Sequence, residues 1–466
     1  MSNEDDSTEE TSPSRREYLA ALGGGMAAGM AGCTGFGGGG GGGGGQSNTL
    51  EEPIELYTWN LPFLESAIAG TEDSPDSWLE DFETQFDDKY EFADPATKWT
   101  DRGPGTEEIL SYFQSRLQGG NPPNVFDTQQ TTFARYNRDD VWASLNEWAD
   151  DEFRSKYYSR LLEVMTKDGE LVNMPFYMGT QATYSRNKWF DEAGIDPPSV
   201  GTYPSTMEYL DMTKEVVDNS GAEFGLVFIR FDWQLYPWFW SEGIDVLTDD
   251  GSEVAFGTDR TREILSRFRQ LTQNGYMPEV AWTGNWKPAA EQFGAGNTAM
   301  YYGSGSALRL IQNYGSDFVG GDTVTIGGSP NNDRYGGLLT MHGLGVVKPN
   351  HSKLAQEASF DLISVITNEK WQEHFLRNTT VLVPNKSAVN KLRNDEEFNN
   401  NNPLLTTIYS LWDDVSSDVW VPPLIEGASE MAQIIDSQFS AAALGEKSVD
   451  EAVDAAVRQS NQAISN

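Results

Sequence analysis

Polar and aromatic side chains close two short apolar runs that we expect to form strands. Trp59 and Asn60 end the run IELYTWN, and Gln129 and Gln130 end the run VFDTQQ. Open α/β sheets bind ligands at the carboxyl ends of their strands, where these four side chains would lie. Amides donate and accept hydrogen bonds and an indole offers an apolar face, so this pattern favours binding of a small polar molecule. For Trp59, packing under a helix is the alternative.

A single guanidinium stands in the loop TDRGPG, among residues too small to block access to it. Arg102 lies just before an expected helix start at Thr106, and its planar fork suits two neighbouring hydroxyl groups. A solvated turn arginine is the alternative, and the sequence favours neither. Arg102 with Gly103 and Gly105 is also the one hint of an anion-binding nest, which a phosphate or peptide ligand would require.

Tryptophans gather in the segment RFDWQLYPWFWSEG, which places Trp233, Trp238 and Trp240 within eight residues. The segment begins where FGLVFI ends, an apolar run typical of a buried strand. The indoles offer ring faces to a ligand, or they form the core of the helix that follows the strand. Both interpretations stay open.

The sequence contains no motif of nucleophilic, metal-dependent or nucleotide-dependent catalysis. No G-x-S-x-G, H-E-x-x-H, P-loop or dinucleotide-binding pattern occurs. Paired carboxylates can hydrolyse glycosides, but among 71 acidic residues any particular pair is uninformative. His342, His351 and His374 are isolated from one another and the chain has one cysteine, so we expect no metal site and no cofactor.

Hydrophobic periodicity predicts alternating strands and helices. Strands are expected at 54–60, 125–129, 224–229, 297–302 and 336–347. Helices are expected at 76–90, from Thr106 to Gly119, from an Asp259 cap to Gly275, from Ser352, around Trp371 and Phe375, and over the tail from Pro422. This rhythm predicts an α/β protein.

The N-terminus has the layout of an export signal. Arg15 and Arg16 precede a short apolar run, Tyr18 to Ala31, whose 14 residues are fewer than the roughly 20 needed to span a bilayer. A pair of arginines in this position is typical of twin-arginine signals, which a dedicated export machine reads.

The four residues Met-Ala-Gly-Cys that end at Cys33 resemble a lipobox. Residues 1–32 are therefore expected to be a cleaved lipoprotein signal, and Cys33 to be lipidated. Residues 33–50 contain nine consecutive glycines and are expected to be a flexible tether. A folded protein would thus be held close to a membrane.

Acidic residues outnumber basic ones by 71 to 32, which gives a formal net charge of −39. The excess is spread along the chain, as expected for a halophilic protein that stays soluble in molar salt, where the Debye length is about 3 Å. No basic patch is present, so nucleic-acid binding is excluded. With 38% hydrophobic and 12% aromatic residues, the chain has the composition of a folded protein.

Five segments, in order along the chain, resemble those of the extracellular solute-binding proteins of ABC importers, family 1, which includes maltose-binding and multiple-sugar-binding proteins. They are GGNPPNVFDTQ (119–129), KDGELVNMPFYMGTQATYSRNKWFDEAGIDPP (167–198), FGAGNTAMYYGSG (293–305), KPNHSKLAQEASFDLISVITNEKWQEHFLRNTTVLVPNKSA (348–388) and ALGEKSVDEAVDAA (443–456). The stretch NKWFDEAGIDPP is the most specific. Asn124 replaces a usual aspartate, and a tryptophan often found after the third segment is absent.

The resemblance implies a two-lobe periplasmic-binding-protein-like fold of the class II type, with a ligand cleft between α/β lobes that close about a hinge. The chain would cross between the lobes near 174–186, 330–336 and 379–384. The N-terminal lobe would comprise residues 54–177 and 337–379, and the C-terminal lobe residues 185–330 and 384–466.

The resemblance also adds candidates for ligand binding. In the family, the loop after the strand FGLVFI supplies an acidic and an aromatic residue to the cleft, and here Asp232 and Trp233 fit these positions best. Sugars offer apolar faces and hydroxyl edges, which aromatic planes, amides and carboxylates match. Further candidates at crossings or strand ends are Tyr177, Gln181, Trp286, Tyr302 and Gly337, the last through close approach of its backbone.

The function that the resemblance implies is capture of a sugar or oligosaccharide at the cell surface and its delivery to the permease subunits of an ABC transporter. We expect a monomer with no enzymatic activity, anchored by lipid to the outer face of the cytoplasmic membrane. The alternatives are binding of another small solute such as a polyol, glycerol phosphate or peptide, a secreted glycoside hydrolase, and a lipoprotein without a role in transport.

Overall fold

The computed structural model describes residues 48–58, 77–101, 106–129, 136, 140–230, 233–283, 286–308, 311, 323–379 and 381–465. The chain divides into two units, residues 1–47 and 48–466, and only the second contains described residues. The predicted signal arginines Arg15 and Arg16 and the predicted lipidation site Cys33 therefore lie outside the described part.

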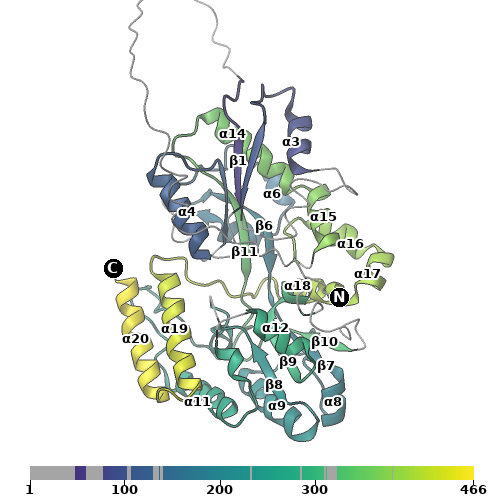
Figure 1. Ribbon diagram of the computed structural model, residues 1–466, viewed down its shortest axis with the longest axis vertical. Helices are drawn as coiled ribbons and strands as arrows, with labels where there is room; N and C mark the ends of the chain where they lie inside the picture. Colours follow the sequence, from purple (N-terminus) through teal and green to yellow (C-terminus); the bar gives the residue numbers. More distant parts are fainter. Residues whose placement is uncertain are drawn as a thin grey trace, which may run out of the picture. The chain divides into compact units, whose positions relative to one another are not determined.

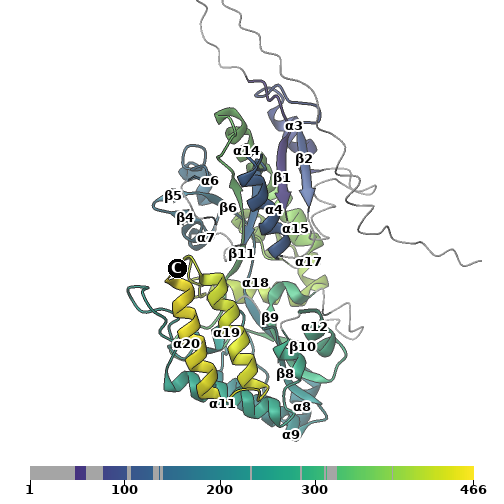
Figure 2. The same ribbon diagram turned by 60° about the vertical axis from the view of Figure 1, so that its left-hand side comes forward.

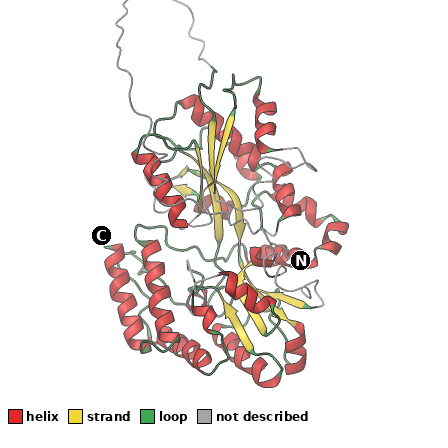
Figure 3. Ribbon diagram, viewed as in Figure 1, coloured by secondary structure: helices red, strands yellow, loops and turns green. Residues whose placement is uncertain are grey.

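Two main sheets, each with its own helices, organise the second unit (Figures 1 and 3). The first has the strand order β2-β1-β3-β11-β6. Strands β1, β2 and β3 are parallel, and β11 runs antiparallel to both of its neighbours, β3 and β6. The bounds are β1 (Ile54–Thr58), β2 (Thr97–Asp101), β3 (Val125–Gln129), β6 (Asn173–Gly179) and β11 (Thr340–Val346).

The second sheet has the order β10-β7-β9-β8, with β8 parallel to β9 and β7 antiparallel to β9 and β10. Its strands are β7 (Gln181–Arg186), β8 (Phe224–Phe228), β9 (Thr298–Ser304) and β10 (Val324–Gly327). A small hairpin, β4 (Thr166–Lys167) and β5 (Glu170–Leu171), stands apart from both sheets.

One set of helices belongs to the first sheet. Phe113 of α4 stacks on Phe126 of β3 at 3.9 Å between ring centroids, and α14 packs against α3, β1 and β11. The set comprises α3 (Trp78–Phe86), α4 (Thr106–Gln118), α6 (Asp151–Ser155), α7 (Ser159–Val164), α14 (Lys353–Ile366), α15 (Glu369–Asn378) and α16 (Lys386–Arg393), the last against α15.

A second set surrounds the second sheet, and Figure 2 shows α19 and α20 side by side against α11. These helices are α8 (Asn187–Ala193), α9 (Thr206–Asn219), α10 (Pro237–Trp240), α11 (Asp259–Gln273), α12 (Trp286–Gly294), α19 (Ala428–Ala443) and α20 (Val449–Ile464). The remaining pieces are α17 (Glu396–Asn401), α18 (Pro403–Val415) and the 3-10 turns η2 (Glu279–Trp282) and η3 (Gly305–Ala307). The predicted α/β fold class is confirmed.

Local chemistry explains where the predicted helices begin. Ser352 caps α14 as predicted, with its hydroxyl accepting a hydrogen bond from the amide of Ala355. The prediction that Asp259 caps α11 is wrong by one residue, because Thr258 accepts from the amide of Thr261 and Asp259 is the first helical residue. There its carboxylate complements the positive end of the helix dipole.

Two predicted elements begin later than expected. The expected strand 336–347 starts only at Thr340, and the expected C-terminal helix starts at Ala428 instead of Pro422. Ahead of Thr340, the amide of Trp420 donates to the carbonyl of Gly337, and the amide of Leu339 donates to the carbonyl of Trp420. Residues 337–339 therefore pair with Trp420 before the strand begins.

The chain passes from one sheet to the other through a single residue. Strand β6 of the first sheet ends at Gly179 and β7 of the second begins at Gln181, so Thr180 is the only residue between these two strands. This passage lies within the first expected crossing. A second passage, residues 328–339, leads from β10 back to β11. Near the third expected crossing, Leu382 forms a bridge with Met178 of β6.

Candidate functional site

The carboxyl ends of strands from both sheets meet at Thr180. Because β6 runs towards Thr180 and β3 has the same direction as β6, both end at this edge of the first sheet. Strand β7 runs away from Thr180, so its antiparallel neighbours β9 and β10, and β8, end at the facing edge of the second sheet. Ligands of α/β proteins bind at such edges.

Gly179 marks how closely the two edges approach. A Cβ atom on this residue would lie 2.7 Å from Thr340 Oγ1 of the first sheet and 3.2 Å from Ser304 Oγ of the second. A side chain here would collide with Thr340 and press on Ser304, so glycine permits the close passage of the chain between the sheets.

A buried polar network lines the edge of the second sheet. Tyr302 donates to Gln181 Oε1 at 2.6 Å and pairs with Ser329 Oγ at 2.9 Å. Gln181 in turn donates from Nε2 to Gln234 Oε1 at 3.1 Å. Burial raises the pKa of the Tyr302 hydroxyl well above its ordinary value, so the group stays neutral. Two predicted candidates, Gln181 and Tyr302, are thus hydrogen-bonded partners.

The passage from β10 to β11 joins this network. Tyr335 accepts a hydrogen bond from the amide of Ser329 at 3.1 Å, and burial raises the pKa of its hydroxyl to about 12. A Cβ on Gly337 would lie 2.1 Å from the Tyr335 ring. The predicted candidate Gly337 therefore allows close packing, but the group it admits in this structure is the Tyr335 ring.

Four aromatic residues form a cluster, here the Trp420 cluster, beside this passage. Trp420 lies 5.7 Å from Trp233, 5.3 Å from Tyr236 and 5.5 Å from Trp240 between ring centroids. Trp233 has a φ of 72°, a conformation that costs a non-glycine residue free energy and that concentrates at functional positions. Its ring is buried, and its Nε1 has no hydrogen-bond partner among the described residues.

Trp238, by contrast, belongs to the core. It is fully buried against Tyr209, Phe268 and Tyr302, with ring centroids 5.5, 5.6 and 4.9 Å away. Its burial among these rings agrees with the core interpretation, one of the two that the sequence leaves open. Trp238 is the second residue of the short helix α10, and its ring packs on Tyr302 of β9.

Trp240 is only half-buried, and one face of its ring is occupied. The Arg334 guanidinium lies 3.3 Å from the ring centroid, donates from Nε to the Trp240 carbonyl at 2.8 Å, and pairs with Asp245 at 2.9 Å. Cation–π contact and charge pairing together fix the passage residue Arg334 to the segment that follows β8.

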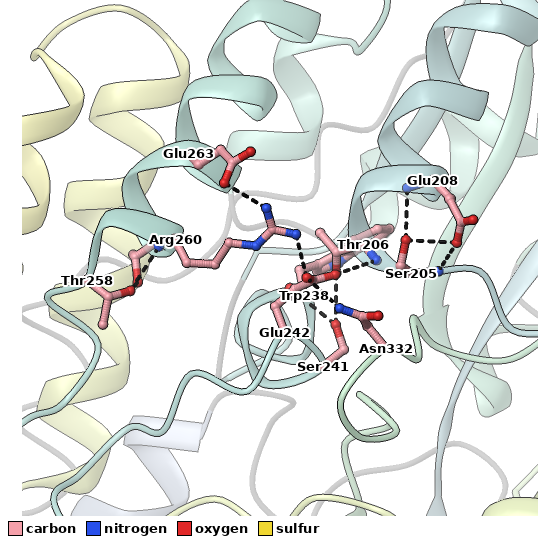
Figure 4. A network of polar contacts seen from close by, with 11 residues as sticks. Ser205, Thr206, Glu208, Trp238, Ser241, Glu242, Thr258, Arg260, Glu263 and Asn332 are labelled. Carbon is pink, nitrogen blue, oxygen red and sulfur yellow. Dashed lines mark hydrogen bonds and ion pairs between the residues drawn. The ribbon is translucent and has the colours of Figure 1, made fainter.

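Glu242 fixes the same passage from the other side (Figure 4). Its carboxylate accepts from the Thr206 amide at the start of α9 at 3.0 Å, from Arg260 of α11 at 2.6 Å and from Asn332 of the passage at 3.1 Å. The hydrogen bond that Arg260 donates to Glu242 raises the pKa of Arg260. The side chain of Glu242 is only 1% exposed. Figure 4 shows that the carboxylate joins three separate segments at one point.

In the first sheet, polar groups lie beneath the strand ends. His342 Nδ1 is 2.9 Å from the buried Asp127 carboxylate, and the Tyr177 ring stacks on the imidazole at 4.2 Å between centroids. Tyr177, a predicted candidate, is buried, and desolvation raises the pKa of its hydroxyl. Gln129, another candidate, ends β3 opposite His342 and is half-buried. His342 is therefore paired within the sheet.

Several candidates lie outside the described residues, or lack a described side chain. Trp286 begins α12. The candidates outside are Trp59, Asn60, Arg102, Gln130 and Asp232. In the sequence, Trp59, Arg102 and Gln130 directly follow β1, β2 and β3.

The residues predicted from the sequence do not include Gln234, Ser329 and Trp420, which the structure brings into this network and cluster. Gln234 directly follows Trp233 in the quoted tryptophan segment, so its polar type was a usable signal. Ser329 and Trp420 carry no such signal, because each joins the site through contacts with segments distant in sequence. Among the described residues, no group of three or more His, Cys, Asp and Glu side chains is placed to hold a metal ion. No helix of that part is both long and apolar enough to cross a bilayer.

The family model for bacterial extracellular solute-binding proteins matches residues 73–407. This chain belongs to that family. A solute-binding relative, the arabinooligosaccharide-binding protein of Halalkalibacterium halodurans, is 25% identical over 139 residues, which is 30% of this chain and 30% of that protein. The sn-glycerol-3-phosphate-binding periplasmic protein UgpB of Salmonella paratyphi A is 22% identical over 317 residues, 64% of this chain and 68% of that protein.

Solved structures show the fold of this solute-binding protein. An ABC substrate-binding protein from Listeria monocytogenes in complex with cycloalternan matches with a TM-score of 0.70 and 16% identity, over 90% of this chain and 100% of the other. UgpB from Mycobacterium tuberculosis in complex with glycerophosphocholine has a TM-score of 0.70 and 15% identity, over 89% and 98%. The maltose-bound MalE3 of T. maritima has a TM-score of 0.68 and 16% identity, over 88% and 99%. The fold is the two-lobe fold of periplasmic binding proteins.

Proposed function

We propose that this solute-binding protein captures a sugar or oligosaccharide outside the cell and delivers it, unchanged, to the permease of an ABC transporter. The observation that carries the proposal is the meeting of strand ends from two sheets at Thr180, where the Gln181–Tyr302 network lies near the tryptophans that follow β8. Amides and hydroxyls suit sugar hydroxyls, and indoles suit sugar faces.

The lobes in this proposal have the boundaries expected from the sequence, residues 54–177 with 337–379 and residues 185–330 with 384–466. The membership of the strands in two sheets supports this division, whereas α16, within 384–466, packs against α15 of the first sheet. A solute that contacts both lobes stabilises the closed state by its contacts with the second lobe, and closure gives the permease a signal that distinguishes loaded from empty protein.

A second candidate solute is glycerol phosphate or a related polyol. The observation in its favour is the sn-glycerol-3-phosphate-binding relative, which aligns with 64% of this chain. The capture mechanism would be the same, and only the groups that contact the solute would differ. The alternative from a different functional class is an enzyme, a secreted glycoside hydrolase.

The proposal is tested by titrating the protein with mono- and oligosaccharides in molar salt while tryptophan fluorescence is recorded. We expect a saturable change with a micromolar dissociation constant, equivalent to about 8 kcal/mol, and no change in the sugar. Release of shorter sugars would show a hydrolase and would contradict the proposal.

The role of Trp233 has its own test. Trp233→Ala is expected to weaken sugar binding at least about tenfold, which is about 1.4 kcal/mol. Trp238→Phe is the matched control, because Trp238 lies in the core and its replacement should lower stability while leaving affinity unchanged. Unchanged affinity in a folded Trp233→Ala variant would assign Trp233 to the core as well.

We also propose that the protein is exported with a twin-arginine signal and held on the membrane by a lipid on Cys33, with the glycine-rich segment as its tether. Cys33→Ser is expected to release the protein into the medium. Lysines in place of Arg15 and Arg16 are expected to keep the precursor inside the cell. Retention of the Cys33→Ser protein on membranes would contradict the anchor.

A further inference from the structure

Arg230 differs from the other half-buried arginines of the described residues. Each of the others has a carboxylate or a main-chain carbonyl as partner, as Arg116 has Glu55 and Arg260 has Glu242. Arg230 is half-buried and its Nε is shielded from solvent, yet no hydrogen bond or ion pair joins it to any described residue.

This lack of a partner is unusual in so acidic a chain. With 71 acidic and 32 basic residues, a carboxylate is easily placed beside a cation. A guanidinium N–H that is shielded from water without an acceptor costs free energy. The shielded Nε of Arg160 and of Arg267 also lacks an acceptor, but each of these guanidinium groups pairs with a carboxylate through another nitrogen, whereas that of Arg230 pairs with none among the described residues. Sites that bind ligands commonly keep such a group ready for the ligand to satisfy.

Arg230 also lies at the candidate site. It follows β8 by two residues, and Phe228 at the end of β8 pairs with Tyr302 of β9. Two residues further along, β9 reaches Ser304, which pairs with Gln181. Continuing the register therefore places Arg230 level with Ser304 and Gln181, at the edge of the second sheet that faces the first.

We propose that Arg230 binds an anionic group of the transported solute, a phosphate or a carboxylate, and so selects a charged sugar or polyol over its neutral counterpart. The inference rests on the proposed function and narrows its substrate class. A guanidinium presents two parallel N–H groups to such an oxyanion, a geometry that a hydroxyl cannot use fully. It also offsets the repulsion that a chain of net charge −39 exerts on an anion.

The test compares neutral and anionic probes by titration calorimetry: glucose, glucuronate and glucose 6-phosphate, and glycerol with sn-glycerol 3-phosphate. The wild type is expected to bind at least one anionic probe more tightly than its neutral counterpart. Arg230→Gln should weaken that probe about 10- to 100-fold and change the neutral probe little, because a hydrogen bond to a charged group is lost. Tighter binding of glucuronate would indicate a sugar acid as the solute, and tighter binding of glucose 6-phosphate or sn-glycerol 3-phosphate would indicate a phosphate ester.

Two further variants complete the design. Arg458→Gln is the control, because Arg458 is an exposed arginine of α20 and its loss changes the net charge equally. Arg230→Lys keeps the charge but loses the two parallel N–H donors of the guanidinium, so we expect an intermediate affinity for the anionic probe. If Arg230→Gln does not fold, Arg230→Lys decides, and an unchanged affinity for the anionic probe overturns the inference.

The possible failures are distinguishable. Saturable binding of neutral sugars without preference for the anionic probes overturns this inference and leaves the proposed function intact. An anionic preference that persists in Arg230→Gln overturns the role of Arg230. Absence of binding by all of these probes overturns this inference, and absence of binding also by the oligosaccharides of the fluorescence titration overturns the proposed function.

Discussion

Tyr301 and Tyr302 are neighbours on β9 with opposite hydrogen-bonding situations. Tyr302 donates to Gln181 and pairs with Ser329, whereas the buried hydroxyl of Tyr301 has no partner among the described residues. We expect Tyr302→Phe to lower the free energy of unfolding by about 1–3 kcal/mol, because Gln181 and Ser329 lose a partner in a buried place.

Tyr301→Phe is the matched control for this prediction. It removes the same atom from the next residue, where no bond is lost, so stability should be unchanged or slightly higher. Urea unfolding of the two variants measures the difference. Equal effects would mean that the hydrogen bonds of Tyr302 contribute nothing to the free energy of unfolding.

His351 provides a prediction about pH. Its Nε2 lies 3.2 Å from the Pro123 carbonyl and its Nδ1 lies 3.3 Å from Asn124 Nδ2, an arrangement that suits a neutral ring. Burial lowers the pKa of His351 below its ordinary value of 6.5. In the window between the folded and the unfolded pKa, the unfolded chain binds more protons, so stability is complete above the window and falls as the pH falls through it.

His351→Gln should therefore lose less stability than the wild type when the pH is lowered through this window. His374→Gln controls for the removal of an imidazole elsewhere. Urea unfolding at a series of pH values measures the effect. Parallel pH profiles for His351→Gln and the wild type would contradict the neutral buried imidazole.

At the scale of single residues, the sequence predicted Gln181 and Tyr302 as ligand-binding candidates but did not predict the hydrogen bond between them. Residues at strand ends can be found from hydrophobic runs, since the runs end where the polar groups begin. Partners such as Trp420 cannot be found in this way. Trp420 lies in an irregular segment and reaches Trp233 only because its backbone pairs with Gly337 and Leu339.

At the scale of elements, Glu242 holds α9, α11 and the passage between β10 and β11 together. Glu242→Gln keeps the shape but removes the charge that pairs with Arg260 and replaces one acceptor oxygen with a donor group. We expect it to lower the free energy of unfolding by about 2–3 kcal/mol, because a buried charged pair is broken. Urea unfolding measures this loss.

Glu263→Gln is the matched control, because Glu263 pairs with the same Arg260 but its side chain is 56% exposed. An exposed pair contributes little, so the change should stay within about 0.5 kcal/mol. Equal losses in the two variants would show that burial of Glu242 is not what matters.

The elements that were expected, such as β1, β3, β8, α11 and α14, have periodic apolar residues or capped ends, as at Ser352. Strands β2, β6, β7 and β10, the hairpin of β4 and β5, and helices α6 to α10, α12 and α16 to α18 were not among the strands and helices expected from periodicity. Strand β10 has only four residues, too few for a period to be recognised. The start of β11 was missed because pairing with Trp420, a tertiary contact, removes Gly337 and Leu339 from the strand.

At the scale of the whole molecule, a net charge of −39 makes stability depend on salt. Self-repulsion among surface carboxylates weakens as the Debye length shortens, so the melting temperature should rise between about 0.1 M and about 2 M KCl. Sodium chloride should give the same rise if screening is the cause. A melting temperature that falls with either salt would contradict the proposed halophilic adaptation.

The most direct test of the central claim identifies the solute itself. The protein is dialysed to equilibrium against a mixture of neutral and anionic mono- and oligosaccharides and polyols. The bound molecules are then extracted, and their masses are determined by mass spectrometry. We predict enrichment of one chemical class, about one molecule per chain, with unchanged mass. No enrichment of any component, or recovery of shortened sugars, would contradict the claim that this protein captures a solute for transport.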